Sequence, residues 1–420
     1  MQTTILPSYT SGNIKAIASK SVAHRMLICA AFADAPSIIE CQETNEDITA
    51  TAECLCALGA TVVREGLCYR VTPIKQLNEN ALLPCNESGS TMRFLVPICA
   101  ALGGEYTFDM KGRLPSRPLS PLKELLEENG ITFTKNHPSQ LTLSGKLTGN
   151  RFEIAGDVSS QFITGLLFAL TLKGDESTLN VTKKLESAPY VNITLDALSS
   201  FGVNVKRSGN EFTIPRDASL IAPQKICVEG DWSNAAFPLA LGLIGKAPVK
   251  ISGLSLSSSQ GDKEIVNILK AFGGNIKEED GALVAEPSVL CGIDVDASQI
   301  PDLVPIVATV ATVAKGRTVI YNASRLKLKE SDRLQSTTEV LSTLGASIFT
   351  TDDGLIIEGK DALCGGSVSS FGDHRIAMSA AVASVICNAP VTIDGSEATQ
   401  KSYPSFWEDM RALGLKFEQK

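Results

Sequence analysis

The chain has 420 residues, which is long for a single hydrophobic core, so we expect two globular bodies. Hydrophobic residues make up 44% and charged residues 20%, as is typical of a soluble protein, and the net charge of −8 argues against a mainly basic nucleic-acid-binding surface. Eleven scattered cysteines without a C-x-x-C pair favour a reduced cytoplasm over a disulfide framework. Neither a secretory signal nor an apolar run of membrane-spanning length is evident, so we expect no membrane partner.

Taken in chain order, the predicted elements recur in a six-fold repeat. Within each repeat a short strand leads to the polar start of an apolar helix. These starts are Lys20, Ser90, Ser160, Ser233, Asp302 and His374. A second helix follows in each repeat, and its start is also polar. The residues there are Asp47, Arg117, Tyr190, Asp262, Lys329 with Glu330 and Arg333, and Lys401.

Each second helix ends at a glycine that precedes another strand-like segment. These glycines are Gly59, Gly130, Gly202, Gly273, Gly345 and Gly414, in steps of 71, 72, 71, 72 and 69 residues. The pattern predicts a helix end, a left-handed glycine and then a strand. Each repeat therefore reads as an α/β unit of the form βαβαββ. If the helices pack in parallel, their starts converge on one anion-attracting region despite the net negative charge.

Two features predict where an anion would bind. Ser88, Gly89 and Ser90 precede an apolar run, so we expect a capped helix start whose backbone a ligand can approach at Gly89. Arg93 lies four residues further on and is predicted to share that helix face. The alternative is a capped helix with a surface arginine. Arg333 and Arg375 also stand at helix starts, with no obvious acidic partner, and a cation there is unfavourable unless it shares an anion.

No Walker lysine motif, dinucleotide glycine pattern or metal-ligand spacing is present. Seven motifs, in order along essentially the whole chain, instead resemble those of the 5-enolpyruvylshikimate-3-phosphate synthase (EPSP synthase) family. They are Lys20-Ser21 with Arg25, residues 89–93, residues 113–118, residues 156–161, residues 329–333, residues 373–375 and Lys401.

The resemblance implies two globules of three βαβαββ units each, an inside-out α/β barrel, joined by a two-strand hinge. The first globule would span residues 17–229 and bind shikimate 3-phosphate. The second would combine residues 1–16 with 230–420 and bind the carboxylate of phosphoenolpyruvate. The implied enzyme is a cytoplasmic monomer that closes when its anionic substrates arrive.

The implied reaction belongs to the shikimate pathway of aromatic amino-acid biosynthesis. The 5-hydroxyl of shikimate 3-phosphate attacks C2 of phosphoenolpyruvate while C3 gains a proton, and phosphate then leaves a tetrahedral intermediate. The resemblance implies no metal and no cofactor.

The resemblance also implies roles for individual residues. The proton-handling residues would be Lys20, Asp302, Glu330 and His374. The shikimate 3-phosphate ligands would be Lys20, Ser21, Arg25, Ser159, Ser160, Gln161, Ser187, Tyr190, Asp302, Arg325 and Lys329. The phosphoenolpyruvate ligands would be Lys20, Gly89, Arg117, Gln161, Arg333, Arg375 and Lys401. The chain departs from the common pattern at His24 and Arg325, where asparagine is usual.

Two alternatives remain at this point. The sister enolpyruvyl transferase acts on UDP-N-acetylglucosamine and uses a loop cysteine before its Arg-Pro, but residues 114–118 contain no cysteine. A non-catalytic anion-binding protein built on the same repeats is the other alternative. The presence of Asp302, Glu330 and His374 argues against it, and phosphate release from the two substrates would discriminate.

Overall fold

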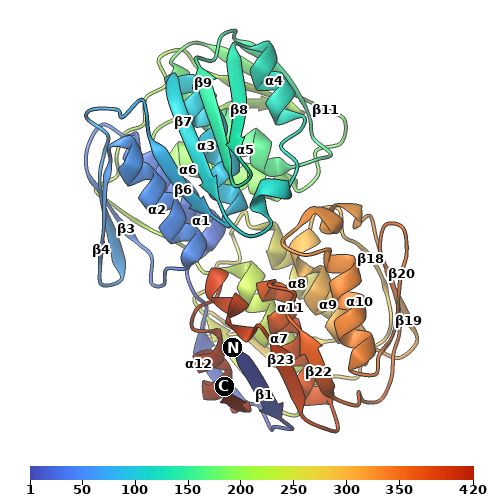
Figure 1. The fold of residues 1–420 in the computed structure, drawn as a ribbon. Helices are drawn as coiled ribbons and strands as arrows, with labels where there is room; N and C mark the ends of the chain where they lie inside the picture. The colour runs from blue at the N-terminus through green and yellow to red at the C-terminus, as the bar shows by residue number, and fades with distance from the viewer. The chain divides into compact units, whose positions relative to one another are not determined.

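The computed structural model describes all residues, 1–420, and the chain forms two compact units (Figure 1). We call Lys20–Val228 the continuous unit, and Met1–Ser19 together with Glu229–Lys420 the discontinuous unit. Each unit contains three repeats, so the helices, strands and short 3-10 helices (η) are given repeat by repeat.

The continuous unit holds the first three repeats. The first comprises α1 (Lys20–Ala31), β3 (Ser37–Glu40), α2 (Glu46–Leu58), β4 (Thr61–Glu65) and β5 (Cys68–Thr72). The second comprises β6 (Leu82–Asn86), α3 (Gly89–Leu102), β7 (Gly104–Met110), η1 (Leu114–Ser116), α4 (Leu122–Glu128), β8 (Ile131–His137) and β9 (Gln140–Gly145). The third comprises β10 (Arg151–Ala155), α5 (Ser160–Lys173), β11 (Ser177–Thr182), α6 (Ala188–Ser200), β12 (Lys206–Ser208) and β13 (Glu211–Ile214), and is followed by β14 (Lys225–Cys227).

The discontinuous unit begins with β1 (Gln2–Leu6) and β2 (Gly12–Lys15). The fourth repeat comprises α7 (Trp232–Ile244), β15 (Val249–Ser252), η2 (Gly261–Glu264), α8 (Ile265–Ala271), β16 (Asn275–Glu279) and β17 (Ala282–Glu286). The fifth comprises β18 (Asp294–Asp296), η3 (Pro301–Leu303), α9 (Val304–Ala311), β19 (Arg317–Tyr321), η4 (Ser324–Leu328), α10 (Arg333–Thr343), β20 (Ser347–Thr350) and β21 (Leu355–Glu358). The sixth comprises β22 (Gly366–Ser369), α11 (His374–Ala383), η5 (Ser384–Ile386), β23 (Val391–Asp394), η6 (Ser396–Lys401), α12 (Phe406–Ala412) and β24 (Lys416–Gln419).

The predicted α/β repeats are confirmed, and each repeat contributes one four-stranded sheet. The sheet of the second repeat has the order β6-β7-β9-β8, in which β6 and β7 are parallel and the later pairs are antiparallel. The third and fifth repeats follow the same scheme. All six repeat glycines have φ between 84° and 114°, in the left-handed region that only glycine adopts without strain.

Three strands complete the sheet of a repeat to which they do not belong in sequence. The strand before α1, β2, pairs in parallel with β15 of the fourth repeat, and β14 pairs in parallel with β3 of the first. The chain crosses from the discontinuous unit to the continuous unit after β2 and crosses back after β14. Each of these two strands pairs with a strand of its own unit, although that partner belongs to a distant repeat in sequence. The sixth sheet is completed by β1, which lies antiparallel between β23 and β24, beside both chain termini (Figure 1).

The first helix of each repeat is buried along almost its whole length and on all sides, and it therefore lies inside its unit. In the continuous unit, α3 and α5 are buried along almost their entire length, and sheets cover the outside (Figure 1). These two helices approach closely at Gly165, where a Cβ atom would lie 2.5 Å from the carbonyl oxygen of Arg93. Buried helices with solvated sheets agree with the predicted inside-out arrangement.

The position of β1 in the sixth sheet predicts which unit a core substitution in this strand destabilises. Ile5 is fully buried in β1, and Ile5→Ala should lower the stability of the discontinuous unit by about 2–5 kcal/mol because it leaves a cavity. Amide hydrogen exchange should then accelerate in β23 and β24 but not in β3 and β5. Ile39→Ala, at an equally buried position of β3, is the matched control and should have the reverse effect. Equal loss of protection in both units after Ile5→Ala would contradict this placement of β1.

Candidate active site

In the continuous unit, the starts of α1 and α2 form an ion pair. Lys20 Nζ lies 2.8 Å from Asp47 Oδ2, and the two side chains are only 15% and 8% exposed. The start of α2 is capped by Asn45, whose side chain accepts from the backbone N–H of Ile48. A buried cation at a helix start is unfavourable, and Asp47 compensates its charge.

The start of α3 is capped by Ser88, whose Oγ accepts from the backbone N–H of Thr91, as the sequence predicts. The cation beside Gly89 is Arg117, because a Cβ atom at Gly89 would lie 2.7 Å from Arg117 Nη1. Arg93 donates to Gln161 Oε1 at 2.8 Å and to the carbonyl oxygen of Pro118, because a residue one turn into α3 is covered by α5. Its part in this cradle stays a prediction.

The starts of α5 and α6 carry the hydroxyl residues of the predicted shikimate 3-phosphate set. Ser159 caps α5 by accepting from the backbone N–H of Gln161, and Gln161 Nε2 donates to Ser90 Oγ at 2.9 Å. Ser160 is the first residue of α5. Ser187 caps α6 with φ 55°, a left-handed conformation that is strained for serine and is typical of functional sites.

Arg25 is almost fully buried beneath these helix starts. Its guanidinium donates to the carbonyl oxygens of Ser21 and Tyr190 and to the hydroxyls of Thr164 and Thr194. These bonds use four of its five N–H groups. Burial lowers the pKa of Arg25 to about 9, although Tyr190 opposes the shift. The threonine partners carried no recognisable signal in the sequence.

His24 begins a chain of buried hydrogen bonds that links α1, α2 and α3. Its Nδ1 lies 2.7 Å from Thr51 Oγ1, which lies 2.6 Å from Thr91 Oγ1, and Thr91 donates to Ser88 Oγ at 2.7 Å. Burial lowers the pKa of His24 to about 3, and Lys20 adds to the shift while Asp47 opposes it. The imidazole is therefore neutral at physiological pH.

In the discontinuous unit, three cations converge on Asp302. Its Oδ1 lies 3.2 Å from Lys329 Nζ and 2.7 Å from Arg333 Nη1, and its Oδ2 lies 3.4 Å from Arg375 Nη2. Burial opposes ionisation, but Arg375, Lys329 and Arg333 together hold the pKa of Asp302 well below its usual range. Burial also lowers the pKa of Lys329, although Asp302 opposes that shift.

The expectation that Arg333 lacks an acidic partner is wrong. Its side chain is 1% exposed and bonds to Asp373 through Nε (2.8 Å) and Nη2 (3.2 Å), to Asp302 through Nη1 and to Glu330 through Nη2 (2.9 Å). Burial opposes its charge, but these three carboxylates raise the pKa of Arg333 further above its usual value. Asp373 was visible in the sequence only as a neighbour of His374, because it reaches Arg333 from the next repeat.

Arg375 also has an acidic partner, because its Nη2 lies 3.4 Å from Asp302 Oδ2. The same nitrogen donates to Ser233 Oγ at 2.8 Å.

His374 opens α11, with Nδ1 3.7 Å from Asp373 Oδ1. Lys401 is buried at the end of η6, and Arg325 on η4 donates to the carbonyl oxygen of Ser298 at 2.8 Å. Their predicted roles as ligands stay predictions.

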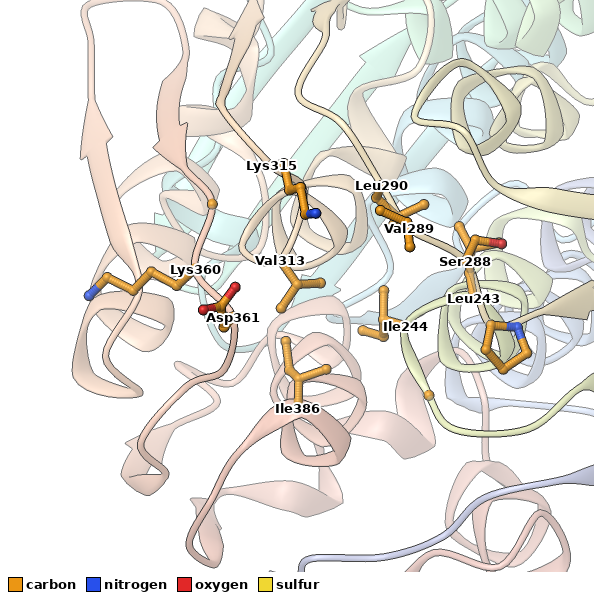
Figure 2. Close-up of a pocket in the computed structure, with 13 residues that line it drawn as sticks. Leu243, Ile244, Ser288, Val289, Leu290, Val313, Lys315, Lys360, Asp361 and Ile386 are labelled. Atoms are coloured by element: carbon orange, nitrogen blue, oxygen red, sulfur yellow. The ribbon is translucent and has the colours of Figure 1, made fainter.

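A separate hollow of about 280 Å³ lies in the discontinuous unit, where α7 and η5 end (Figure 2). Ile244, Val313 and Ile386 form its apolar part, and Lys360 points away to donate to the carbonyl oxygen of Gly345. Helix C-termini present carbonyl groups rather than N–H groups, so this end does not suit an anion. No cluster of three or more His, Cys, Asp or Glu residues is arranged to hold a metal ion, and no helix is long and apolar enough to cross a membrane.

The fold is that of the enolpyruvyl transferases. The chain resembles the solved EPSP synthase of Acinetobacter baumannii with a TM-score of 0.81 at 25% identity, over 99% of each chain. The enolpyruvyl transferase NikO from Streptomyces tendae matches with a TM-score of 0.79 over 99% of this chain and 98% of that chain. Its 17% identity supports the fold alone.

The sequence comparison narrows this class to one family. A family profile described as EPSP synthase (3-phosphoshikimate 1-carboxyvinyltransferase) matches residues 6–410, and the chain belongs to that family. The 3-phosphoshikimate 1-carboxyvinyltransferase of Clostridium kluyveri is 42% identical over 412 residues, covering 98% of this chain and 96% of the relative. That of Clostridium acetobutylicum is 40% identical over 418 residues, with the same coverage. The predicted family is confirmed, and the UDP-N-acetylglucosamine alternative is not favoured.

The lowered pKa of His24 predicts a specific pH dependence of stability. Between about pH 6.5 and pH 3 the unfolded chain binds a proton at this histidine that the folded chain does not, so stability should fall as the pH falls. His24 should account for a loss of about 1 kcal/mol in unfolding free energy between pH 7 and pH 5.5.

Urea denaturation followed at both pH values would measure this loss, and His24→Asn should remove it. His137→Asn, at the exposed histidine of β8, is the matched control and should leave it in place. An undiminished pH dependence in His24→Asn would show that other groups cause it.

Proposed function

We propose that the chain transfers the enolpyruvyl group of phosphoenolpyruvate to the 5-hydroxyl of shikimate 3-phosphate and releases phosphate, within the shikimate pathway of aromatic amino-acid biosynthesis. Family membership over nearly the whole chain supports this activity. The observation that carries the residue assignments is the half-buried carboxylate of Asp302 surrounded by three cations. A coupled assay of phosphate release from the two substrates tests the activity and separates it from mere anion binding.

Arg333 and Arg375 bind the carboxylate of phosphoenolpyruvate in this proposal. In the structure both guanidiniums contact Asp302, whose carboxylate has the shape and charge of that substrate group. An incoming carboxylate would compete with Asp302 for these donors. Asp302 would then lose part of its stabilisation, its pKa would rise, and it would become a better base as the substrate arrives.

The phosphate of phosphoenolpyruvate is assigned to cations and N–H donors at helix starts. The residues are Lys20, Gly89, Arg117, Gln161 and Lys401. Backbone N–H groups and the positive end of α3 at Gly89, together with the adjacent Arg117 guanidinium, suit an anion. Shikimate 3-phosphate is assigned to the hydroxyl-rich starts and their neighbours. These are Lys20, Ser21, Arg25, Ser159, Ser160, Gln161, Ser187, Tyr190, Asp302, Arg325 and Lys329.

The reaction needs one group to take the proton of the 5-hydroxyl and another to deliver a proton to C3. Asp302 and Glu330 take these roles in the proposal, with Lys20 and His374 assisting. Addition gives a tetrahedral intermediate, and loss of phosphate with a proton from C3 restores the enol ether. Asp302 is ionised at neutral pH because its pKa is low, and it would gain basicity once the substrate carboxylate took over part of its contacts with Arg333 and Arg375.

We also propose a cytoplasmic monomer that binds neither nucleic acid nor membranes. Eleven cysteines in the free thiol form support a reducing compartment, and the net charge of −8 supports the absence of a nucleic-acid partner. Small anions are its proposed partners.

Asp302→Asn preserves the shape of the side chain and removes its charge, so it should lower kcat about 10²–10⁴-fold. Shikimate 3-phosphate should still bind, as isothermal calorimetry would show. Asp294→Asn, at an exposed position of β18, is the control and should retain wild-type turnover. Full kcat in Asp302→Asn would mean that this carboxylate is structural.

Gly89→Ala should displace the Arg117 guanidinium, because the new methyl group would fall 2.7 Å from Nη1. The KM for phosphoenolpyruvate should rise by about tenfold or more, the effect of losing roughly 1.4 kcal/mol, while that for shikimate 3-phosphate changes far less. Gly209→Ala, where nothing lies within 4 Å of the added atom, should leave both KM values unchanged. A similar rise for both substrates would point to a general packing defect.

A further inference from the structure

Every repeat has a pair of residues at its two helix starts, which we call the helix-start pair. In the first repeat it is Lys20 with Asp47, and in the fifth it is Asp302 with Lys329, each 27 residues apart and in contact. The same separation holds in three other repeats. The pairs there are Ser90 with Arg117, Ser160 with Ser187, and His374 with Lys401. The pair of the fourth repeat is Ser233 with Asp262, 29 residues apart, and the proposed function gives it no role.

Ser233 and Asp262 are joined by a hydrogen bond at the start of α7. Ser233 is the second residue of α7, whose cap Asp231 accepts from the backbone N–H of Asn234. Asp262 lies on η2 and is 3% exposed. The hydroxyl of Ser233 donates to Asp262 Oδ2. A serine hydroxyl has one hydrogen, and Asp262 accepts it. The Ser233 oxygen can therefore only accept hydrogen bonds from its other neighbours.

Arg375 is the donor that meets these lone pairs. Its Nη2 donates to Ser233 Oγ at 2.8 Å and lies 3.4 Å from Asp302 Oδ2. Asp302 and the hydroxyl that Asp262 orients therefore contact the same nitrogen of the guanidinium, Nη2. If the substrate carboxylate displaces Asp302 from Arg375, the guanidinium still keeps its hydrogen bond to Ser233.

We propose that Ser233 and Asp262 are positioning residues of the phosphoenolpyruvate site. Asp262 orients the Ser233 hydroxyl, and Ser233 holds the Arg375 guanidinium where it meets the substrate carboxylate. This inference rests on the proposed function, in which Arg375 binds that carboxylate. It assigns a role in substrate binding to the helix-start pair of the fourth repeat.

The electrostatics of the cluster agree with this role. Burial and the nearby charge of Asp302 raise the pKa of Asp262 to about 6, while Arg375 and the bond from Ser233 oppose the shift. The charge of Asp231 also acts on Asp262. Asp262 is therefore mostly ionised at neutral pH, and an ionised carboxylate is a strong acceptor for the Ser233 hydroxyl.

The test compares variants of the full chain by steady-state phosphate release. Ser233→Ala removes the link to Arg375, and Asp262→Asn removes the charge that orients the hydroxyl. Each should raise the KM for phosphoenolpyruvate, by about tenfold for Ser233→Ala. The KM for shikimate 3-phosphate should change by less than about twofold, because Arg375 is not assigned to that substrate. Ser233→Thr keeps the hydroxyl and should restore most of the affinity.

Ser384→Ala is the matched control, because Ser384 is a buried serine of the same unit whose hydroxyl donates to the carbonyl oxygen of Ala381 at 2.6 Å. It should leave both KM values unchanged. Thermal denaturation of each variant checks folding, and if Ser233→Ala does not fold, Asp262→Asn and Ser233→Thr still decide the question.

A double-mutant cycle with Arg375→Ala shows whether Ser233 affects the KM for phosphoenolpyruvate through Arg375. In that background, Ser233→Ala should cause no further rise in the KM for phosphoenolpyruvate. Additive effects, or equal rises for both substrates, would overturn the positioning role. If Arg375→Ala raises this KM but Ser233→Ala does not, the inference fails while the proposed function stands. If Arg375→Ala itself has no effect, the proposed carboxylate site fails.

Discussion

Cations at the starts of buried helices need carboxylates beside them, and this requirement shapes the polar end of both units. The positive end of a helix dipole disfavours a nearby cation, and burial removes the water that would screen it. The structure meets the requirement with Asp47 beside Lys20 and with Asp302, Glu330 and Asp373 around Arg333. Asp373 belongs to the sixth repeat and Arg333 to the fifth, so the same ion pairs also tie neighbouring repeats together.

An enzyme for anionic substrates benefits from this arrangement. Carboxylates such as Asp302 hold the guanidiniums in place before substrate arrives, and a substrate carboxylate of the same shape can then take over part of those bonds. Because the donors are already oriented, binding needs less ordering of side chains, although Asp302 gives up part of its stabilisation. In the proposed function this exchange of partners would also link binding to proton transfer, because Asp302 would become more basic as it lost its partners.

The two units solve the same packing problem with different residues. In the continuous unit the layer one turn below the helix starts is built from hydroxyls and the neutral His24 around a single cation, the buried Arg25, with threonines among the main partners. In the discontinuous unit the corresponding polar layer is a network of full charges around Arg333. A layer held mainly by hydroxyls specifies geometry through hydrogen bonds, whereas in the proposed function the network of opposite charges would also respond to an incoming anion.

The sequence by itself was sufficient to predict the six repeats, the starts of their first helices, the left-handed glycines and the family. These depend on local signals, since hydrophobic periodicity, capping residues and glycine conformation act within a few residues of one another. The motif order along the chain identified the family without any knowledge of contacts.

Only the tertiary structure decided which side chains meet. Helical spacing placed Arg93 on the face of Gly89, but α5 covers that turn, and Arg117 from the following loop lies beside Gly89 instead. Two acidic partners of Arg333 could not be read from the sequence because Asp373 lies 40 residues away and Asp302 lies 31 residues away, whereas Glu330, three residues before it, was a local signal that was missed. The exchange of β2 and β14 between sheets was equally hidden from local patterns. In each case the partner is set by how whole repeats pack, and periodicity along one segment contains no information about its neighbour in space.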